Sequence, residues 1–358
     1  MDATASLLND TGTVSDRYLE IRPGLGLATR FFGGQLHANY EPALRSFGSF
    51  SPTRSPSHRV GATLDLGADG PFQLSVREAW AAGVLEVQEV DPGGEYFFDL
   101  QRFSRNAVGL SARHEVAPTW TLAAGSALTL VRFDDPGAFF DYDIWTVDFG
   151  VDHEITENLH ASFGLVHDRV PQTLDRPEAE STAYGVRAGL TGQASPFVST
   201  QVTIGYREEE HPFAGAGGQK YRGLVLGGAV TRTLGRASRV TLTGSRSALL
   251  SAFEDNGYYV SNQVETSTVF RIPHGFFLDA AIGYRWNEYA TVSPQIDAPR
   301  EDNLFDWRVG LRRPIGSGTI GTSYQRQRRR SNIDRFDTST DRLILQFDFD
   351  VLRATGLR

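Results

Sequence analysis

The sequence of 358 residues contains no cysteine, no methionine beyond Met1 and one lysine, Lys220. Without cysteine the chain has no disulfide framework, no thiolate metal site and no cysteine nucleophile. No stretch approaches the ~20 consecutive apolar residues of a membrane-spanning helix. The formal net charge is -8, and this acidic balance argues against nucleic acid as the partner.

The chain is rich in glycine and aromatic residues, with 37 Gly, 23 Phe, 12 Tyr and 5 Trp. So many apolar rings exclude a disordered chain. Apolar and polar residues alternate along most of the sequence, whereas no helical stripe of comparable length is present. In the last such segment Leu343, Leu345, Phe347 and Phe349 alternate with polar residues, apart from Ile344. This period of two predicts strands with one apolar and one polar face.

We count about seventeen alternating segments, each close to the ~9–11 residues of a tilted transmembrane strand. The connections between them alternate strictly between short and long. Short turns are predicted at Phe31–Gly34, Gly67–Pro71, Ala117–Thr119, Thr156–Asn158, Gly192–Pro196, Leu234–Ala237, Pro273–Gly275 and Arg313–Gly316. Long polar connections are predicted at Arg45–Ser57, Leu85–Ser104, Asp134–Phe140, Pro171–Glu180, Glu208–Gln219, Ser247–Tyr258, Glu288–Asn303 and Arg328–Thr340. This alternation favours a transmembrane β-barrel over a Greek-key sandwich.

Aromatic residues stand next to both sets of connections, as expected for the two membrane interfaces. Phe31, Phe32, Trp120, Phe197, Phe276 and Phe277 lie beside short turns. Tyr40, Trp80, Phe139, Phe140, Tyr206, Tyr221, Tyr258, Tyr259, Trp286 and Tyr289 lie beside long connections. We therefore expect an all-β fold, a single antiparallel transmembrane β-barrel of about 16–18 strands in a Gram-negative outer membrane.

The predicted strand count is odd, whereas a single-chain bacterial barrel has an even number of strands. Residues 1–16 are polar and turn-rich and are interpreted as a loop segment, and residues 17–358 as the barrel. The first turn is short, so the first strand would run inwards from the outside of the cell. We therefore expect one strand and a signal peptide upstream of Met1, giving about eighteen strands. The alternative is a cleaved signal with one segment miscounted, for example inside Leu85–Ser104.

The N-terminal stretch carries a family resemblance. Asn9-Asp10-Thr11-Gly12 is followed by Ser15-Asp16 and by the strand Tyr18-Leu19-Glu20-Ile21-Arg22-Pro23-Gly24-Leu25. This order resembles the family of outer-membrane β-barrel porins of the second type, in which an Asn-containing loop leads to a Ser-Asp pair and a Pro-Gly strand. The resemblance implies a porin-like channel linked to exopolysaccharide export, with periplasmic export proteins as partners. The chain departs from many outer-membrane proteins by running past Phe349 to Arg358 instead of ending on an aromatic residue.

The polar phase of the strands predicts the side chains that line the lumen. A barrel of this size is wide enough for an aqueous channel, and arginine forks suit carboxylates, phosphates and sugar hydroxyls. The functional interpretation is a path for an anionic or hydroxylated solute, and the structural one is a network of ion pairs that stiffens the wall. The predicted lumen residues are Arg113, Arg187, Arg207, Glu265, Asp279, Arg285, Asp306, Arg308, Arg312 and Asp348.

Two further groups of residues, a basic cluster and three regularly spaced histidines, are candidates for a binding site. The basic cluster Arg326, Arg328, Arg329, Arg330 and Arg335 could contact lipopolysaccharide or an acidic polymer, or be a solvated loop balanced by nearby aspartates. His153, His160 and His167 repeat every seven residues, a step that flips the face of a strand, so they do not line one metal site. We expect no metal, no cofactor and no catalytic residue.

The expected function is passage of a hydrophilic solute, most specifically in exopolysaccharide export. The expected partners are outer-membrane lipid, lipopolysaccharide, polysaccharide and periplasmic export proteins. Two alternatives remain open at this point: a nonconducting structural or interaction barrel, and a general nutrient porin with Leu85–Ser104 as its constriction loop. An enzyme is not expected.

Overall fold

The computed structural model describes most of the chain. The described residues are 3–9, 12–21, 23–31, 33–47, 56–68, 70–84, 102–134, 141–171, 180–214, 218–235, 237–251, 257–293, 296–316 and 318–349. Within these ranges the chain forms one sheet of nineteen strands and two single 3-10 turns, η2 (Pro273–Gly275) and η3 (Asp334–Phe336). No helix in these ranges is long and apolar enough to cross a membrane.

The strands follow one another along the sheet in chain order. The first ten are β1 (Ala3–Asn9), β2 (Gly12–Ile21), β3 (Leu25–Phe31), β4 (Gly34–Phe47), β5 (Ser57–Leu66), β6 (Phe72–Val84), β7 (Arg102–Ala117), β8 (Trp120–Phe133), β9 (Tyr142–Thr156) and β10 (Leu159–Val170). The others are β11 (Ser181–Ser195), β12 (Val198–His211), β13 (Gln219–Leu234), β14 (Ser238–Leu250), β15 (Tyr258–Arg271), β16 (Phe277–Ser293), β17 (Ala298–Ile315), β18 (Gly318–Ser331) and β19 (Thr338–Phe349). From β3 to β19 each strand pairs antiparallel with the next, so the fold is a meander of hairpins.

The N-terminal residues differ from the prediction in two ways. Residues 1–16, expected to be a loop, contain β1 and the first part of β2, because backbone pairing does not require apolar side chains. The first predicted strand is divided at Pro23 and Gly24, where proline has no N–H to donate. Since β2 and β3 both pair with β4, the nineteen strands occupy eighteen positions, within the predicted range. β1 is therefore one strand more than we counted in the chain.

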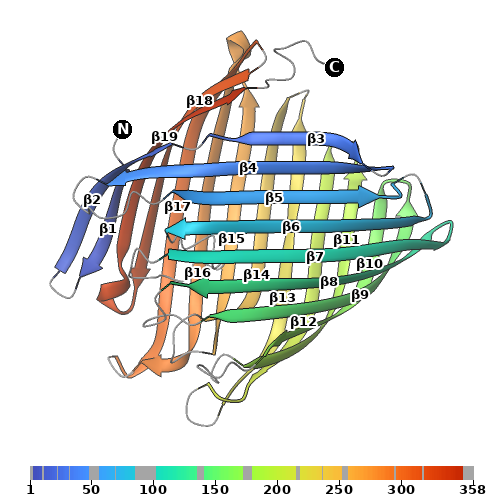
Figure 1. The fold of residues 1–358 in the computed structure, drawn as a ribbon, viewed down its shortest axis with the longest axis horizontal. Helices are drawn as coiled ribbons and strands as arrows, with labels where there is room; N and C mark the ends of the chain where they lie inside the picture. The colour runs from blue at the N-terminus through green and yellow to red at the C-terminus, as the bar shows by residue number, and fades with distance from the viewer. Residues whose placement is uncertain are drawn as a thin grey trace.

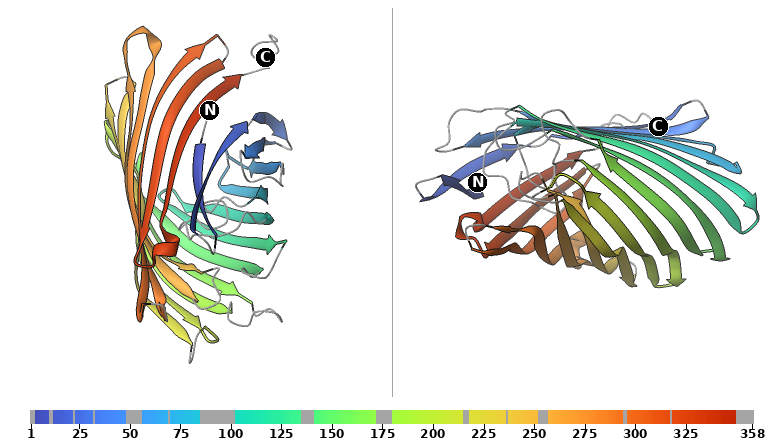
Figure 2. Two further views of the ribbon diagram at one scale, coloured as in Figure 1. Left: turned by 90° about the vertical axis from the view of Figure 1, so that its left-hand side faces the viewer. Right: turned by 90° about the horizontal axis from the view of Figure 1, so that it is seen from below.

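The ends of the sheet meet at β1. This strand pairs antiparallel with β2 over its whole length and with β19 through two residues, Thr4 and Ala5, opposite Asp341 and Thr340. Figure 1 shows strands β3 to β9 crossing in front of the later strands at a large angle, so the sheet is strongly twisted. Figure 2 shows the same chain from the side and from below as two curved walls facing each other. The fold is a single antiparallel transmembrane β-barrel, as predicted.

The predicted alternation of short and long connections is confirmed for most hairpins. The predicted long connection Glu288–Asn303 is wrong, because β16 runs to Ser293 and β17 begins at Ala298, which leaves four residues between them. Two-residue turns join β7 to β8, β9 to β10 and β11 to β12, whereas the connections at the other rim are longer in most hairpins. Many strands exceed the ~9–11 residues that cross a bilayer, and β17 has 18 residues. They extend past the membrane because backbone pairing continues where the apolar face ends. The predicted constriction loop Leu85–Ser104 lies mostly outside the described residues, so the nutrient-porin alternative is not tested.

The two faces of the sheet have different chemistry. Large apolar side chains are exposed on the outward face, among them Phe163 on β10 (54%) and Ile204 on β12 (51%). Trp120 and Phe197 are exposed beside short turns, as expected for an interface belt. Three tyrosines predicted in the opposite belt, Tyr221, Tyr259 and Tyr289, are buried. Together with Tyr258 they form packed clusters, in which Tyr221 contacts Tyr258 and Tyr259 stacks on Tyr289.

The best-buried side chains gather in one half of the barrel. The largest of them are Val131, His211, Ser251, Tyr259, Asn287 and Asp302. All six lie in the half of their strands next to the long connections, or within such a connection. Because a lipid-facing barrel has no conventional core, this packed half is where side chains on the inside of the wall replace water. The opposite half, next to the short turns, carries the exposed polar side chains described below.

Candidate functional site in the inner wall

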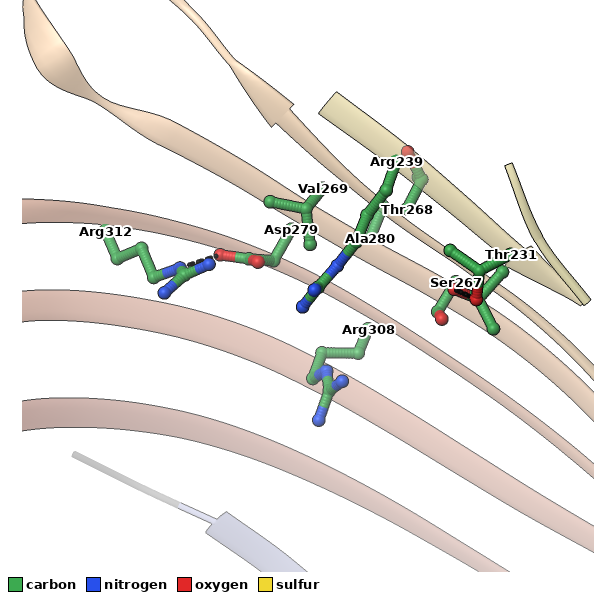
Figure 3. Close-up of a pocket in the computed structure, with 10 residues that line it drawn as sticks. Thr231, Arg239, Ser267, Thr268, Val269, Asp279, Ala280, Arg308 and Arg312 are labelled. Carbon is green, nitrogen blue, oxygen red and sulfur yellow. Dashed lines mark hydrogen bonds and ion pairs between the residues drawn. The ribbon is translucent and has the colours of Figure 1, made fainter. Parts of the chain in front are cut away.

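A polar recess of about 290 Å³ lies in the half of the barrel next to the short turns. Five consecutive strands, β13 to β17, contribute to it (Figure 3). Its lining residues are Thr231, Arg239, Thr241, Ser267, Thr268, Val269, Asp279, Ala280, Arg308 and Arg312. A second recess continues from it over β18 and β19 and shares Asp279, Arg308 and Arg312.

Strand register brings these side chains together. Thr241 lies opposite both Thr231 and Ser267 in the ladder, so the three hydroxyl groups form one polar row. The Thr231 and Thr241 hydroxyls are 2.9 Å apart and form a hydrogen bond. Arg308 lies opposite Ala281, and the small alanine leaves the arginine side chain room over the wall. The alternation that exposes Val309 to lipid therefore places Arg308 on the inner face.

The arginines of the recess differ in their partners. The Arg312 Nε donates to an oxygen of Asp279 at 2.8 Å, so this pair is internally compensated. Arg239 and Arg308 have no carboxylate within 4.0 Å among the residues that the structure describes. Figure 3 shows the Arg239, Arg308 and Arg312 side chains extending into the same recess. The lining side chains therefore carry an excess of positive charge, and Arg308 is also attracted by the Asp306 carboxylate two residues away on β17.

A larger polar recess of about 730 Å³ lies on the other wall, lined by β4 to β12. Its charged lining residues are Asp65, Arg77, Arg113, Asp148, Asp152 and Arg187. Two of the three arginines are paired here. Arg113 contacts Asp152 at 2.5 Å and Arg187 contacts Asp148 at 2.8 Å. Arg77 has no carboxylate within 4.0 Å in the described part of the chain.

The ion pairs of this wall follow one rule. Arg113 with Asp152, Arg187 with Asp148, and Arg207 with Asp168 each join residues 39 positions apart in the sequence. Each pair reaches over one intervening strand, since the partners lie on β7 and β9, β9 and β11, and β10 and β12. Arg207 also donates to Glu209 at 2.8 Å. These arginines, and Arg312, form ion pairs with carboxylates of the same wall. They therefore fit the interpretation of a network that stiffens the barrel.

The other four predicted lumen residues lie in different surroundings. Arg285 donates to the Gln263 side chain at 3.0 Å. Asp306 lies opposite Gly283, where an added Cβ would come within 2.6 Å of its carboxylate. Glu265, which lies opposite Gly283 on the other edge of that strand, is half-buried. Asp348 pairs with Thr319 through the backbone of β19, and its side chain lies outside the described residues.

Sequence reasoning missed Arg239, Arg77 and Asp152. Arg239 lies at the start of β14, next to a short turn. The signal was nevertheless present, because Arg239 shares the phase of Thr241 and Thr243 on one strand. Strand phase alone could not predict which arginines are paired, since a partner two strands away depends on the register.

The three histidines alternate between the faces of the sheet, as predicted. His153 stacks on Trp120 with centroids 4.3 Å apart, and His167 stacks on Tyr184 at 4.6 Å. His160 lies opposite Glu154 on the other face. The described residues contain no group of three or more side chains placed to hold a metal ion.

Comparison with known proteins gives structural neighbours without close sequence relatives. No family model and no curated protein matches the chain. The FrpB iron transporter of Neisseria meningitidis is similar with a TM-score of 0.50 at 10% identity, and the match covers 92% of this chain and 61% of that one. OpdK of Pseudomonas aeruginosa, solved with vanillate, gives a TM-score of 0.49 at 13% identity and covers 96% of each chain. At these identities the likeness concerns the fold alone.

The fold and the two-faced sheet define the class of protein. An apolar outward face, a polar inner wall and alternating short and long connections belong to barrels of the bacterial outer membrane. The chain is an outer-membrane β-barrel of porin-like architecture, and it spans less than two thirds of the length of the FrpB chains that it matches.

Proposed function

We propose that this protein is a passive channel for hydrophilic solutes, with a preference for solutes that carry carboxylates or phosphates. The observation that carries the proposal is the recess of β13 to β17, where Arg239 and Arg308 lack a carboxylate partner among the described residues. Such guanidinium groups offer several N–H donors in a fixed plane, a geometry that matches carboxylates and phosphates. Neighbouring hydroxyls of Thr231, Thr241 and Ser267 offer the donors and acceptors that sugar hydroxyls need.

The mechanism needs no chemical step. The polar wall replaces part of the hydration of a passing solute, and the arginines raise the local concentration of anions. Arg308 acts by attraction and Arg312 chiefly by shaping the recess, because Asp279 already neutralises Arg312. The protein is accordingly proposed to be a transporter and not an enzyme. FrpB, whose fold it shares, is an iron transporter.

An acidic polysaccharide is the solute that best fits both the family resemblance of the sequence and the arginine and hydroxyl side chains of the recess. Such a polymer presents carboxylates and hydroxyls in alternation, which suits a wall where arginines alternate with threonine and serine. The resemblance of the Asn9–Leu25 stretch to porins of the second type supports export of exopolysaccharide with periplasmic export proteins.

The test uses ion selectivity. Refolded wild-type protein, Arg308→Gln and Arg313→Gln are compared in planar bilayers under a salt gradient. Both substitutions remove one positive charge from β17, but Arg313 contacts Phe276 at the short-turn end of the strand, on the face opposite to Arg308. We expect R308Q to lower the anion-to-cation permeability ratio about twofold, and R313Q to leave it unchanged. Equal ratios in all three proteins would remove Arg308 from the solute path.

The solute class is tested in the same bilayers. An acidic oligosaccharide should block the wild-type current more strongly than a neutral oligosaccharide of equal length, and R308Q should reduce this difference. Equal block by both sugars would contradict the acidic-polysaccharide proposal while leaving the channel itself intact.

A nonconducting structural or interaction barrel is the second candidate. The observation that favours it is the packed half next to the long connections, where Asp302 and Asn287 have no exposed surface. A folded, heat-modifiable barrel that inserts into the bilayer without conductance would select this candidate.

A further inference from the structure

Three arginines alternate along the outer half of β18. Arg326, Arg328 and Arg330 are all exposed, and residues two apart on a strand point to the same face about 6.7 Å apart. Between them Arg329 points to the opposite face, where it is buried and lies 4.0 Å from Asp302. We call Arg326, Arg328 and Arg330 the outward arginine stripe.

The stripe shares its face with the lipid-facing side chains of the barrel. Further along β18, the same phase contains Ile320, which is exposed. Across the ladder Arg326 lies opposite Trp307, and Arg328 lies opposite Phe305, which is 43% exposed. The stripe therefore continues the apolar, aromatic surface of the barrel towards the long connections. In a bacterial barrel the long connections are extracellular, so the stripe lies at the outer leaflet.

Within the described part of the chain, the stripe has more positive charges than carboxylate partners. Arg326 approaches Asp341 at 3.8 Å, but that carboxylate also accepts a hydrogen bond from the Tyr324 hydroxyl at 2.5 Å. Arg328 and Arg330 have no carboxylate within 4.0 Å in the part of the chain that the structure describes. Nearer the long connections, the neighbouring strands carry acidic groups, since Glu288 of β16 lies opposite Glu301 of β17. The positive charge is thus confined to a narrow strip above the aromatic row.

We propose that the outward arginine stripe is a docking surface for lipopolysaccharide, whose phosphates it binds in the outer leaflet. Guanidinium groups bind phosphate oxygens through paired, charge-assisted hydrogen bonds. The acyl chains of the same lipid pack against the exposed aromatic and aliphatic side chains below, such as Phe305 and Ile320. This surface faces away from the inner wall, so the inference goes beyond solute passage and does not depend on it.

A lipid is the occupant that the observations favour over a polymer in solution. The stripe is continuous with the lipid-facing surface, and its strand neighbours are rings that prefer the membrane interface. A soluble acidic polymer would need the charge on the extracellular loops instead. Of the basic cluster expected from the sequence, Arg329 belongs to the inside of the wall and Arg335 lies in η3, so only the alternate members form this surface.

The test measures lipid binding by the refolded, full-length chain in detergent micelles. Native mass spectrometry follows the occupancy of bisphosphorylated lipid A, of dephosphorylated lipid A and of phosphatidylglycerol. The variant is Arg328→Gln with Arg330→Gln, and the matched control is Arg313→Gln on the neighbouring strand at the opposite rim. Heat-modifiable migration confirms that each protein is folded, and R330Q alone replaces the double variant if that one does not fold.

The proposal predicts three results. The double variant binds bisphosphorylated lipid A at least about tenfold more weakly, because two charge-assisted contacts are lost. R313Q binds like the wild type, and the wild type loses the same affinity when the phosphates are removed or the salt concentration is raised. Unchanged binding by the double variant would overturn the proposal. Equal affinity for dephosphorylated lipid A or for phosphatidylglycerol would overturn it as well.

Discussion

Glycines in the inner wall leave space for arginine side chains to cross a neighbouring strand. Arg187 on β11 reaches Asp148 on β9 by crossing Gly164 of β10. A Cβ added at Gly164 would lie 3.3 Å from the Arg187 Nε and 3.1 Å from the carbonyl oxygen of Phe149. At the far end of the pair, a Cβ at Gly125 would come within 2.2 Å of the Asp148 carboxylate. The ion pair depends on two missing side chains as well as on two charges.

Replacing Gly164 should therefore destabilise the barrel. We expect Gly164→Ala to lower the free energy of unfolding by about 1–2 kcal/mol, because the backbone or Arg187 must move. The control is Gly109→Ala, where the nearest atom to an added Cβ is 4.0 Å away. Urea unfolding of both variants in lipid vesicles provides the measurement. A Gly164→Ala barrel as stable as Gly109→Ala would show that Arg187 does not need this space.

The Asp302 carboxylate is fully enclosed by the wall. It accepts two hydrogen bonds from Arg300, at 2.6 and 3.0 Å, and the Arg300 guanidinium lies over the rings of Tyr289 and Phe336. Both partners are buried, with side-chain exposures of 6% for Arg300 and 0% for Asp302.

Replacing this carboxylate by an amide removes the negative charge that faces the buried Arg300 guanidinium. We expect Asp302→Asn to cost about 3 kcal/mol of folding free energy. Asp152→Asn serves as comparison, since the Arg113 side chain that it faces is 51% exposed and screened by water. Its cost should stay near ~1 kcal/mol or below. Similar losses in the two variants, measured by equilibrium unfolding, would contradict the assignment of a buried pair.

At the residue scale the sequence predicts the face of a side chain but not its partner. The alternation places Arg113, Arg187, Arg308 and Arg312 together on the polar face. Whether each is paired depends on strand register and on a small residue at the crossing point, and the pattern of one strand contains neither. Arg308 and Arg312 look equivalent in the sequence, yet only Arg312 has a carboxylate at hydrogen-bond distance among the described residues.

At the scale of the element, the connections were the reliable signal. Short, turn-rich connections at one rim fix the order of the hairpins, because neighbouring antiparallel strands need few residues between them. The strand ends were less predictable, since pairing continues into polar sequence beyond the bilayer. The segment before Tyr18 illustrates this limit, because its polar composition indicates a loop whereas its backbone pairs as β1 and β2.

The place of β1 can be tested by cross-linking. The chain has no cysteine, so an introduced pair gives an unambiguous signal. Ala5 and Thr340 are Cα partners, and Cα atoms of an antiparallel pair lie about 4.5–5.5 Å apart, within disulfide range. We expect Ala5→Cys with Thr340→Cys to cross-link on oxidation, as seen by a shift on a denaturing, nonreducing gel.

A register control accompanies this pair. Leu7→Cys with Thr340→Cys moves one partner two residues along β1, which takes the Cα atoms beyond the ~7 Å that a disulfide allows. It should not cross-link. Cross-linking of the control alone, or of neither pair, would contradict the pairing of β1 with β19.

At the scale of the whole molecule, the barrel is divided along its axis. The half next to the long connections packs its inward side chains, including Tyr259 and Asp302, whereas the half next to the short turns exposes arginines to the polar recesses. Side-chain packing of this kind was not predictable from alternation, because strand phase reports the face of a residue and not its depth or neighbours. Because one half is packed and the other is open and polar, a measurement of conductance distinguishes a channel from a plugged barrel.

Single-channel recording of the refolded wild-type protein in a planar bilayer tests the central claim most directly. The polar recesses predict steady current steps, and under a salt gradient the excess of arginines lining the recess of β13 to β17 predicts a reversal potential that favours anions. Insertion of a folded, heat-modifiable barrel without current steps, or with a preference for cations, would contradict the account.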